Sequence, residues 1–377
     1  MKSSTIKYIV ISDIHLGHRN NKTEDIIKNL KVFFNNYAPR RDSLDYIFIA
    51  GDLFDSLLDL STDDIYQAIL WLSVFLGYCK SNKIKLRILE GTSSHDWEQS
   101  KLGELIKNIG QYDVDFKYID SLHIERDDAL GIDILYVPDE WDNDTSVTFR
   151  QVKEMLACNG IDSVDIAIMH GQFTYQLPSA AIKAPKHNEA DYMSIVRYLI
   201  NIGHVHQYST YERIIAQGSF DRLTHGDEEP KGGTYNIINK DGSYEYLFIE
   251  NKGAKTFITI NVKEMPIDKC VDYIRKKTKD LRPGSYVRIR AKKDSSVFKN
   301  FDIIKKEFTD IHLSKVSDDK DEVSKVTATI STDLLGYDPV IIRPDNILES
   351  VMDIIETKYK LDTDSISLAK KQLTESM

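Results

Sequence analysis

Five stretches of the sequence place carboxylate, imidazole or hydroxyl side chains directly after apolar runs. They are Asp13-x-His15, Asp52-x-x-Asp55, Ser94-His95-Asp96, His170 and His204-x-His206. A single aspartate such as Asp55 is more often a helix N-cap, and a lone histidine such as His170 is more often a satisfied turn residue. Five such stretches after successive apolar runs instead predict one shared metal site. Carboxylates and imidazoles together suit Mn²⁺, Fe or Zn²⁺ better than Ca²⁺, which prefers oxygen ligands.

The spacing within these stretches indicates which residues can act together. Residues two apart in an extended segment point the same way, so Asp13-x-His15 and His204-x-His206 each offer two ligands to one region. The carboxylate of Asp52 could then bridge two ions. Two ions about 3.5–4 Å apart can clamp a phosphoryl oxygen and lower the pKa of a water between them toward about 7. The predicted chemistry is therefore metal-assisted hydrolysis of a phosphoester.

Strand-like and helix-like runs alternate over the first two thirds of the chain and must position these side chains. Short β-branched runs lie at 6–12, 45–51, 84–91, 132–138, 164–171, 198–205 and 213–219, and helical patterns lie at 23–37 and 62–80. This rhythm predicts an α/β domain with a largely parallel core, whose sites gather where strands end. Residues 232–250 predict a β-hairpin that turns at Asp241-Gly242.

The pattern changes from about Lys255 onward. Strand-like and helical runs lie at 256–262, 271–281, 285–291 and 300–308, and they predict a small α+β module. Between Arg275 and Lys306 basic residues outnumber acidic ones, although the whole chain carries a net charge of −10. These basic residues could contact phosphates, or they could simply form a solvated charged face.

The last part of the chain predicts a linker and a helical tail. Residues 316–325 have the charged composition of an exposed linker. After Pro344 an apolar stripe recurs at helical spacing, at Ile347, Leu348, Val351, Ile354 and Ile355. Such a stripe could dock into a groove on a partner's coiled coil, or it could pack on the small module. The predicted boundaries are therefore 1–252, 253–315, 316–343 and 344–377.

Composition sets further limits. The chain has 377 residues, of which 41% are hydrophobic, so a large domain with appended parts can bury a core. The three cysteines lack CxxC spacing, which favours a reducing cytoplasm over thiol chemistry. No apolar run is long enough to span a membrane. The acidic balance argues mildly against bulk nucleic-acid binding, although a bound metal would neutralise acids beside the histidines.

In this order, the motifs DxH, GDxxD, HD, H and GHxH resemble the calcineurin-like metallophosphoesterase superfamily over residues 8–208. The stretch 217–233 is similar to the one that follows GHxH in SbcD-like nuclease subunits of double-strand-break repair complexes. The resemblance implies an α/β fold, a sandwich of two mixed β-sheets flanked by helices. It also implies a small α+β capping domain that contacts DNA and a C-terminal helical tail for an ATPase partner.

The resemblance also implies a role for each residue. One metal would be bound by Asp13, His15, Asp52 and His206, and the other by Asp52, His170, His204 and the residue at position 94, Ser94. His95, oriented by Asp96, would protonate the leaving 3′ oxygen, because an imidazole titrates near neutrality. Asp55, where some relatives carry histidine, would have a catalytic role in contact with substrate. DNA would be contacted by Arg222, Lys231, Arg288 and Arg290.

One motif departs from the superfamily pattern. The pattern is GNHD, with Asn as a metal ligand, whereas here three residues ending at Ser94 separate Gly91 from His95. A serine hydroxyl reaches less far than a carboxamide oxygen and is the poorer donor to a cation. We therefore expect the metal that Ser94 would help to bind to be the weaker one. The longer turn could instead bring another hydroxyl or a backbone carbonyl to the ion.

The resemblance favours a Mn²⁺-dependent DNA exonuclease and endonuclease of double-strand-break repair or recombination. It would use two Mn²⁺ ions, with Mg²⁺ or Fe as alternatives, and act on DNA ends, hairpins or single strands. Its partners would be an SbcC-like coiled-coil ATPase and a second copy of the chain, in the cytoplasm of a bacterial or phage-infected cell. Two alternatives stay open. One is a phosphoesterase for cyclic nucleotides, dinucleotide polyphosphates or phosphoproteins, and the other is a non-catalytic scaffold that keeps the metal pocket as structure.

Overall fold

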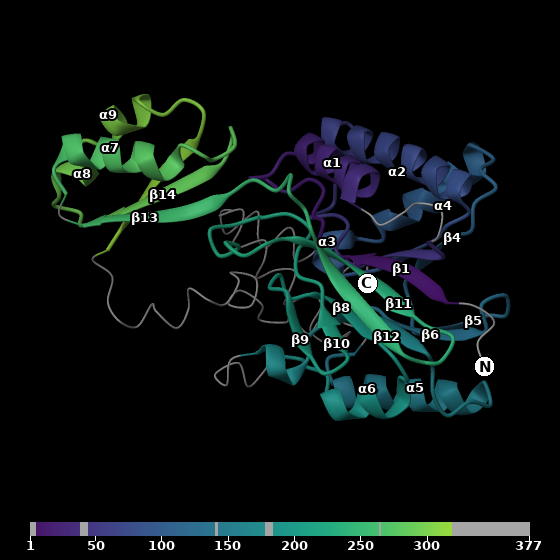
Figure 1. The fold of residues 1–377 in the computed structure, drawn as a ribbon. Helices are drawn as coiled ribbons and strands as arrows, with labels where there is room; N and C mark the ends of the chain where they lie inside the picture. Colours follow the sequence, from purple (N-terminus) through teal and green to yellow (C-terminus); the bar gives the residue numbers. More distant parts are fainter. Residues whose placement is uncertain (1–4, 38–43, 140–141, 178–183, 264, 319–377) are drawn as a thin grey trace, which may run out of the picture. The chain divides into compact units, whose positions relative to one another are not determined.

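Two six-stranded mixed sheets form the larger part of the described chain (Figure 1). The computed structural model describes residues 5–318, except 38–43, 140–141, 178–183 and 264. The predicted tail and all but the first residues of the predicted linker lie outside the described residues.

The first sheet has the order β12-β11-β1-β2-β3-β4. Its strands are β1 (Ile6–Ile11), β2 (Tyr46–Ala50), β3 (Lys85–Leu89), β4 (Phe116–Ile119), β11 (Gly232–Ile238) and β12 (Tyr244–Glu250). Strands β1 to β4 pair in parallel, and the β11–β12 hairpin adds two antiparallel strands beside β1. The hairpin turns at Asp241-Gly242, as the sequence predicts.

The second sheet has the order β5-β6-β7-β8-β10-β9. Its strands are β5 (His123–Asp127), β6 (Ile132–Val137), β7 (Ile166–Gly171), β8 (Ile200–His204), β9 (Ser209–Tyr211) and β10 (Ile214–Ala216). Strands β6, β7, β8 and β10 pair in parallel, and an antiparallel strand closes each edge. The expected parallel cores are therefore present in both sheets.

Helices cover the outer faces of the two sheets (Figure 1). The helices α1 (Thr23–Val32), α2 (Asp63–Asn82) and α4 (Leu102–Ile109) lie on the first sheet. The π-helical turn η1 (Phe33–Tyr37) follows α1, and the short helices α3 (Ser93–Asp96) and η3 (Gln99–Lys101) precede α4. On the second sheet lie α5 (Thr145–Cys158), α6 (Glu189–Ile195) and the 3-10 turn η4 (Thr174–Gln176). Within the described part of the chain, no helix is long and apolar enough to cross a membrane.

The strands are apolar on both faces because each face meets a different core. In β2, Ile47 and Ile49 pack toward the helices, whereas Tyr46, Phe48 and Ala50 pack toward the other sheet. This alternation follows the two-residue period of a strand. The predicted sandwich of two mixed sheets flanked by helices is confirmed at this level.

A third, three-stranded sheet belongs to the C-terminal module of the described chain. It consists of β13 (Phe257–Lys263), β14 (Tyr286–Ala291) and β15 (His312–Ser317), with α7 (Ile267–Thr278), α8 (Ser296–Lys299) and α9 (Phe301–Lys306) between the strands. The module has its own apolar core. All three strands are parallel, so the arrangement is α/β rather than the α+β that the sequence predicts. Each strand returns through a helical crossover, which parallel pairing requires.

Candidate metal centre

The polar residues that follow the strands of both sheets meet at one place. Asp13 follows β1 and Asp52 follows β2, and the Asp13 backbone N–H donates to the Gly51 carbonyl in the neighbouring segment. From the second sheet, His170 lies in β7 and His204 ends β8. Parallel strands end at the same edge of a sheet, so residues distant in the sequence become neighbours there.

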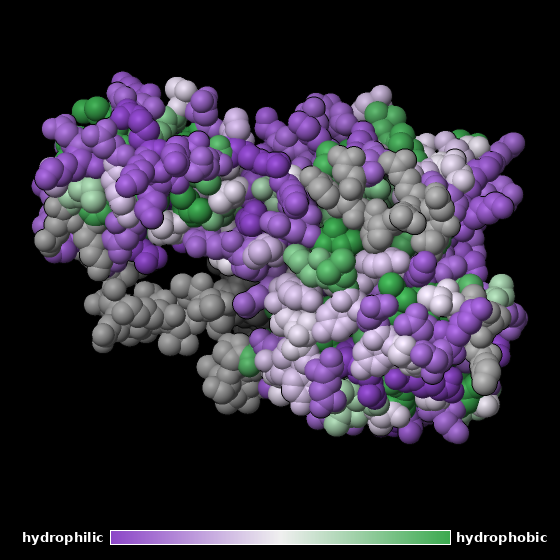
Figure 2. All heavy atoms as spheres, viewed as in Figure 1, coloured by the Kyte–Doolittle hydropathy of each residue, from purple (hydrophilic) through white to green (hydrophobic). Residues whose placement is uncertain are grey.

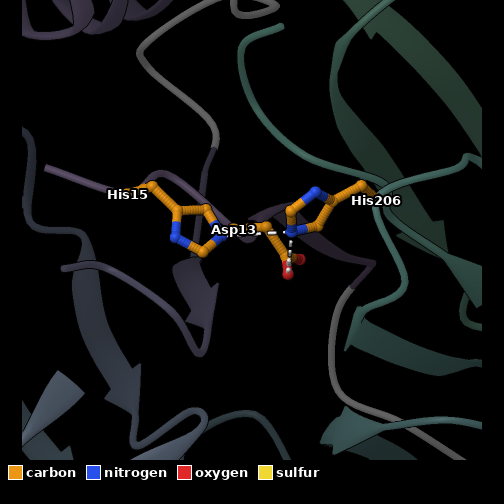
Figure 3. Close-up of side chains that lie close together, drawn as sticks. All are labelled: Asp13, His15 and His206. Carbon is orange, nitrogen blue, oxygen red and sulfur yellow. Dashed lines mark hydrogen bonds and ion pairs between the residues drawn. The ribbon is translucent and has the colours of Figure 1, made fainter. Parts of the chain in front are cut away.

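Asp13, His15 and His206 form the first cluster (Figure 3). His15 Nε2 lies 3.1 Å from His206 Nε2, which in turn lies 3.7 Å from Asp13 Oδ1. Figure 3 shows the two imidazole rings pointing toward each other, with the Asp13 carboxylate beside them. Imidazole nitrogens and a carboxylate converging in this way form a ligand set for a divalent transition-metal ion.

Asp52, His170 and His204 form the second cluster. Asp52 Oδ1 lies 3.3 Å from His170 Nε2, whereas Asp52 Oδ2 lies 3.8 Å from His15 Nε2 of the first cluster. His170 Nδ1 donates to the Ala50 carbonyl at 2.7 Å, which leaves Nε2 to face the cluster. The two oxygens of Asp52 therefore face two different clusters, as a bridging carboxylate must.

Four of these residues hold an unusual backbone conformation. The φ angles of Asp13, His15, Asp52 and His204 are 50°, 55°, 50° and 94°, in the left-handed region that non-glycine residues rarely adopt. Such a conformation costs on the order of 1–3 kcal/mol and persists where the surrounding structure enforces it, typically at functional sites. The fold thus imposes strain on the residues that the sequence singles out.

Two glycines allow the strand ends to approach one another closely. A Cβ atom at Gly51 would lie 2.1 Å from His170 Nδ1, and one at Gly91 would lie 2.2 Å from Asp52 Oδ1. A side chain at either position would push a candidate ligand out of place. Both glycines are therefore part of the site, although neither could bind an ion through a side chain.

The carboxylates change the protonation of the histidines between them. Burial opposes the charged form of His15, but its carboxylate neighbours, led by Asp55, raise its pKa to about 9. Burial likewise opposes the charge on His170, and Asp52 outweighs it, so the pKa of His170 lies well above its usual value. Burial and the nearby His15 lower the pKa of His206 to about 4. The carboxylates thus favour the protonated forms of His15 and His170, and a metal ion would have to displace those protons.

His95 and Asp55 lie beside the first cluster. The His95 ring packs edge-on against the His15 ring, with centroids 5.1 Å apart, and His95 Nδ1 lies 2.8 Å from the Asp55 carbonyl oxygen. Asp55 Oδ1 lies 3.1 Å from His15 Nδ1, an ion pair that orients the ring of a candidate ligand. His95 thus lies at the edge of the first cluster, beside His15 and Asp52. Asp55 contacts both histidines, through its side chain and its backbone carbonyl, and its predicted contact with substrate stays a prediction.

Asp96 does not orient His95 as the resemblance implies. Its carboxylate is buried and accepts backbone N–H groups of Asp52, Phe54 and Gly91, at 3.0, 2.9 and 2.7 Å. Successive residues of a helix are about 100° apart around its axis, so His95 and Asp96 on α3 point in different directions. Asp96 instead ties together the loops that follow β2 and β3.

Thr92, not Ser94, lies at the second cluster. Ser94 is exposed on α3. Thr92 is buried, and its Oγ1 lies 3.4 Å from His170 Nε2 and 3.3 Å from His204 Nδ1. This corrects the prediction that Ser94 is a ligand. Thr92 follows Gly91 directly, as Asn does in GNHD, and the additional residues form the turn of α3 after it.

Asp139 is a member of the centre that the sequence analysis missed. It follows β6, and its Oδ2 lies 3.1 Å from Thr92 Oγ1 and 3.8 Å from His204 Nδ1. The signal was the same as for the other residues, a carboxylate after an apolar strand. A lone aspartate after Pro138 is also typical of a turn, and only the fold distinguishes the two.

Two of the predicted DNA-contacting residues have internal roles. Lys231 is buried and donates to the Asp227 carboxylate at 3.2 Å and to the His206 carbonyl at 2.7 Å. Arg222 donates to the Glu229 carbonyl at 3.2 Å. Lys231 thereby holds the segment that carries His206. Its predicted contact with DNA is corrected, because its charge is neutralised within the protein.

The other two basic residues lie on an accessible strand face. Arg288 and Arg290 are partly exposed on β14, and Val287 and Ile289 on the opposite face pack into the core of the module. Arg288 donates to Thr259 Oγ1 of β13 at 3.1 Å. Both guanidinium groups therefore remain candidates for contact with phosphates.

Comparison with known proteins adds little to this geometry. No protein-family model and no curated protein matches the sequence. Among solved structures, TT1561 of Thermus thermophilus is 10% identical, with a TM-score of 0.37, over 65% of this chain and 99% of that one. A second solved structure is 14% identical, with a TM-score of 0.36, over 65% of this chain and 100% of that one. Likeness at this level establishes no shared fold.

Proposed function

We propose that the protein is a metal-dependent phosphodiesterase with a calcineurin-like fold, an SbcD-like nuclease that cleaves DNA. The observation that carries the proposal is the position of Asp52. Its two carboxylate oxygens face His170 and His15, in two separate carboxylate–histidine clusters. Carboxylate and imidazole donors fit Mn²⁺, with Mg²⁺ and Fe as the alternatives.

The chemistry of the reaction divides between the ions and the chain's own residues. When bound, a pair of divalent ions would supply Lewis-acid polarisation of the phosphodiester and acidify an attacking water. His95 would supply the proton for the leaving oxygen. Because its Nδ1 is bonded to the Asp55 carbonyl oxygen, the transferable proton of the protonated ring lies on Nε2. Asp55 and Asp96 would act by positioning the ring of His15 and the two loops.

DNA is the favoured substrate because of the C-terminal module. Arg288 and Arg290 extend from one face of β14, and basic residues predominate between Arg275 and Lys306. Figure 2 shows a mainly hydrophilic surface over the module that contains α7, α8 and α9. A phosphoesterase for small molecules would not require such a module. Contacts to phosphates would make DNA cleavage sensitive to salt.

A paired assay tests this proposal. The full chain is incubated with linear duplex DNA or with bis-p-nitrophenyl phosphate, in the presence of either Mn²⁺ or Mg²⁺. We expect Mn²⁺-dependent cleavage of both, and Arg288→Ala with Arg290→Ala should reduce only the cleavage of DNA. The control is Arg126→Ala, which removes the charge of a β5 side chain that is 63% exposed and should change neither activity. Turnover of the small ester or a cyclic nucleotide without DNA cleavage would support the alternative phosphoesterase function.

The predicted partners remain proposals. The tail that would dock on an SbcC-like ATPase lies outside the described residues. A homodimer would need an apolar surface, and α2 offers Tyr66, Leu70 and Val74 at helical spacing, with 59%, 45% and 62% exposure. The second copy of the chain therefore stays a prediction from the sequence.

A further inference from the structure

We propose that Asp139 is a metal ligand of the second cluster and that its carboxylate replaces the asparagine of the GNHD pattern. This assignment rests on the proposed two-metal site. Asp139 follows β6, which pairs in parallel with β7, the strand that carries His170. Its Oδ2 lies 3.8 Å from His204 Nδ1, and the side chain is 12% exposed. The carboxylate therefore faces the cluster from a third strand of the second sheet.

Thr92 connects Asp139 with the other donors. The Thr92 hydroxyl donates to Asp139 Oδ2 at 3.1 Å, and its Oγ1 lies 3.3 Å from His204 Nδ1 and 3.5 Å from Asp52 Oδ2. Ligand atoms on one ion, with bonds of about 2.0–2.2 Å, are separated by roughly 3 Å when they are neighbours. The Thr92 hydroxyl thus lies among Asp139, His204 and Asp52, and it holds the Asp139 carboxylate beside the second cluster.

The other carboxylate oxygen, Oδ1, lies near Gly171. A Cβ atom at Gly171 would lie 3.3 Å from Asp139 Oδ1 and 3.4 Å from His187 Nε2. Gly171 has a φ of 131°, which favours glycine, and His187 is buried. Gly171 thus leaves space for Asp139 Oδ1, while Thr92 donates to Oδ2, which is directed at the cluster. A carboxylate oriented by a hydrogen bond in this way is suited to bind a cation.

A carboxylate at this position changes the charge balance of the second site. With Asp52 and Asp139, the site offers two negative charges to a divalent ion, as the first site does with Asp13 and Asp52. A carboxamide or hydroxyl would contribute no charge. We therefore expect the two ions to bind with similar affinity. With Ser94 as the ligand, the sequence instead predicts that the second ion binds more weakly than the first.

Calorimetric titration of the full chain with Mn²⁺ tests the assignment without any substrate. After treatment with a chelator, the unaltered protein should bind two ions with similar affinity. Asp139→Asn should weaken one of them by at least about tenfold, because loss of even an indirect partner of a metal costs that much. Two controls should bind both ions normally: Ser94→Ala, and Asp128→Asn, which removes an equal charge from a side chain that is 88% exposed.

A sulfur ligand distinguishes direct coordination from mere positioning. In Asp139→Cys, a thiolate at the site would bind Cd²⁺, a soft ion, and produce a cadmium–thiolate charge-transfer band in the ultraviolet. Ser94→Cys is the matched control and should show only the background of the native cysteines. Absence of the new band would overturn the assignment even if Asp139→Asn failed to fold.

The outcomes separate this inference from the proposed function. If the Asp139→Asn variant bound two Mn²⁺ ions as tightly as the unaltered protein does, the inference would be overturned. A protein that binds two ions through Asp139 but leaves DNA intact would contradict the proposed nuclease and leave the ligand assignment standing.

Discussion

Two buried polar clusters in this protein satisfy their charges in opposite ways. In the arginine cluster, defined by Arg87, Glu125 and Tyr136 between the two sheets, opposite charges meet directly. Arg87 Nε and Nη2 donate to the two oxygens of Glu125, at 2.9 and 2.7 Å, and the Tyr136 hydroxyl donates to Glu125 at 2.9 Å. This cluster is complete without a ligand.

The metal centre has no such permanent cation. Its carboxylates are Asp13, Asp52, Asp55 and Asp139. Among the described residues, each of them has only histidines as ion-pair partners, and a histidine is charged only when it is protonated. A buried carboxylate needs a cation, because an unpaired buried charge is costly. The contrast indicates that the arginine cluster serves stability, whereas in the metal centre a divalent ion could take the place of the protons on the histidines.

The largest effect should follow from Asp52→Asn. The substitution removes the one carboxylate that both clusters share, so we expect it to abolish turnover and the binding of at least one ion. Bound Mn²⁺ at 100 times its Kd stabilises a protein by about 2.7 kcal/mol per site, and this gain should shrink in the variant. Calorimetry and urea unfolding with and without Mn²⁺ measure both effects. Normal binding of two ions would show that Asp52 is not a bridge.

His95→Asn should reduce turnover by roughly 10²–10⁴, the usual contribution of a general acid, while both ions still bind. Single-turnover cleavage of DNA and Mn²⁺ titration provide the two measurements. A near-normal rate would remove His95 from the mechanism. Because a His95 nitrogen lies within 4.8 Å of donor atoms of His15 and Asp52, loss of an ion would reassign it as a ligand.

Arg87→Met should destabilise the fold by up to about 3–5 kcal/mol, because it removes the bidentate partner of the buried Glu125 carboxylate. Among the described residues, Glu125 would keep only the half-exposed Lys117, at 2.7 Å, and the Tyr136 hydroxyl. The stabilisation that Mn²⁺ provides should be unchanged in this variant, since the arginine cluster binds no ion. Arg126→Met, at a guanidinium that is 63% exposed, should alter stability little. Urea unfolding with and without Mn²⁺ checks the comparison. If Arg87→Met removed the Mn²⁺ effect, the two clusters would not be independent.

The smallest effect concerns pH. Burial opposes the charge on Glu125, but Arg87 outweighs it and lowers its pKa from 4.5 to about 2. A group with a lowered folded pKa stabilises the protein above the unfolded pKa, and the contribution is lost as the pH falls through the folded value. We expect this loss between about pH 4.5 and 2. Glu125→Gln should flatten that part of the stability curve, measured with a chelator present, and an identical slope would contradict the assignment.

The sequence predicts much of the centre because its residues follow apolar strands. Asp13, His15, Asp52, His170 and the GHxH pair all lie where the strand pattern and the resemblance place them. Parallel strands end together, so a one-dimensional pattern becomes a three-dimensional cluster.

The parts that the sequence does not predict depend on contacts between sheets. Thr92 and Asp139 come from different sheets, and each alone is typical of a turn. Strand β5 is missed because Glu125 and Asp127 occupy inward positions, which no hydrophobic alternation reveals. Their partners on the first sheet explain why those acids can be buried there: Arg87 and Lys117 pair with Glu125, and Lys85 and Tyr46 pair with Asp127.

Electron paramagnetic resonance of the full chain with two equivalents of Mn²⁺ tests the central claim most directly. Two Mn²⁺ ions that share the Asp52 carboxylate should be magnetically coupled, because a bridging ligand holds them about 3.5–4 Å apart. We predict a coupled two-ion spectrum that Asp52→Asn abolishes and Arg87→Met leaves unchanged. A spectrum of isolated Mn²⁺ ions in the unaltered protein would contradict the shared two-metal site on which this account depends.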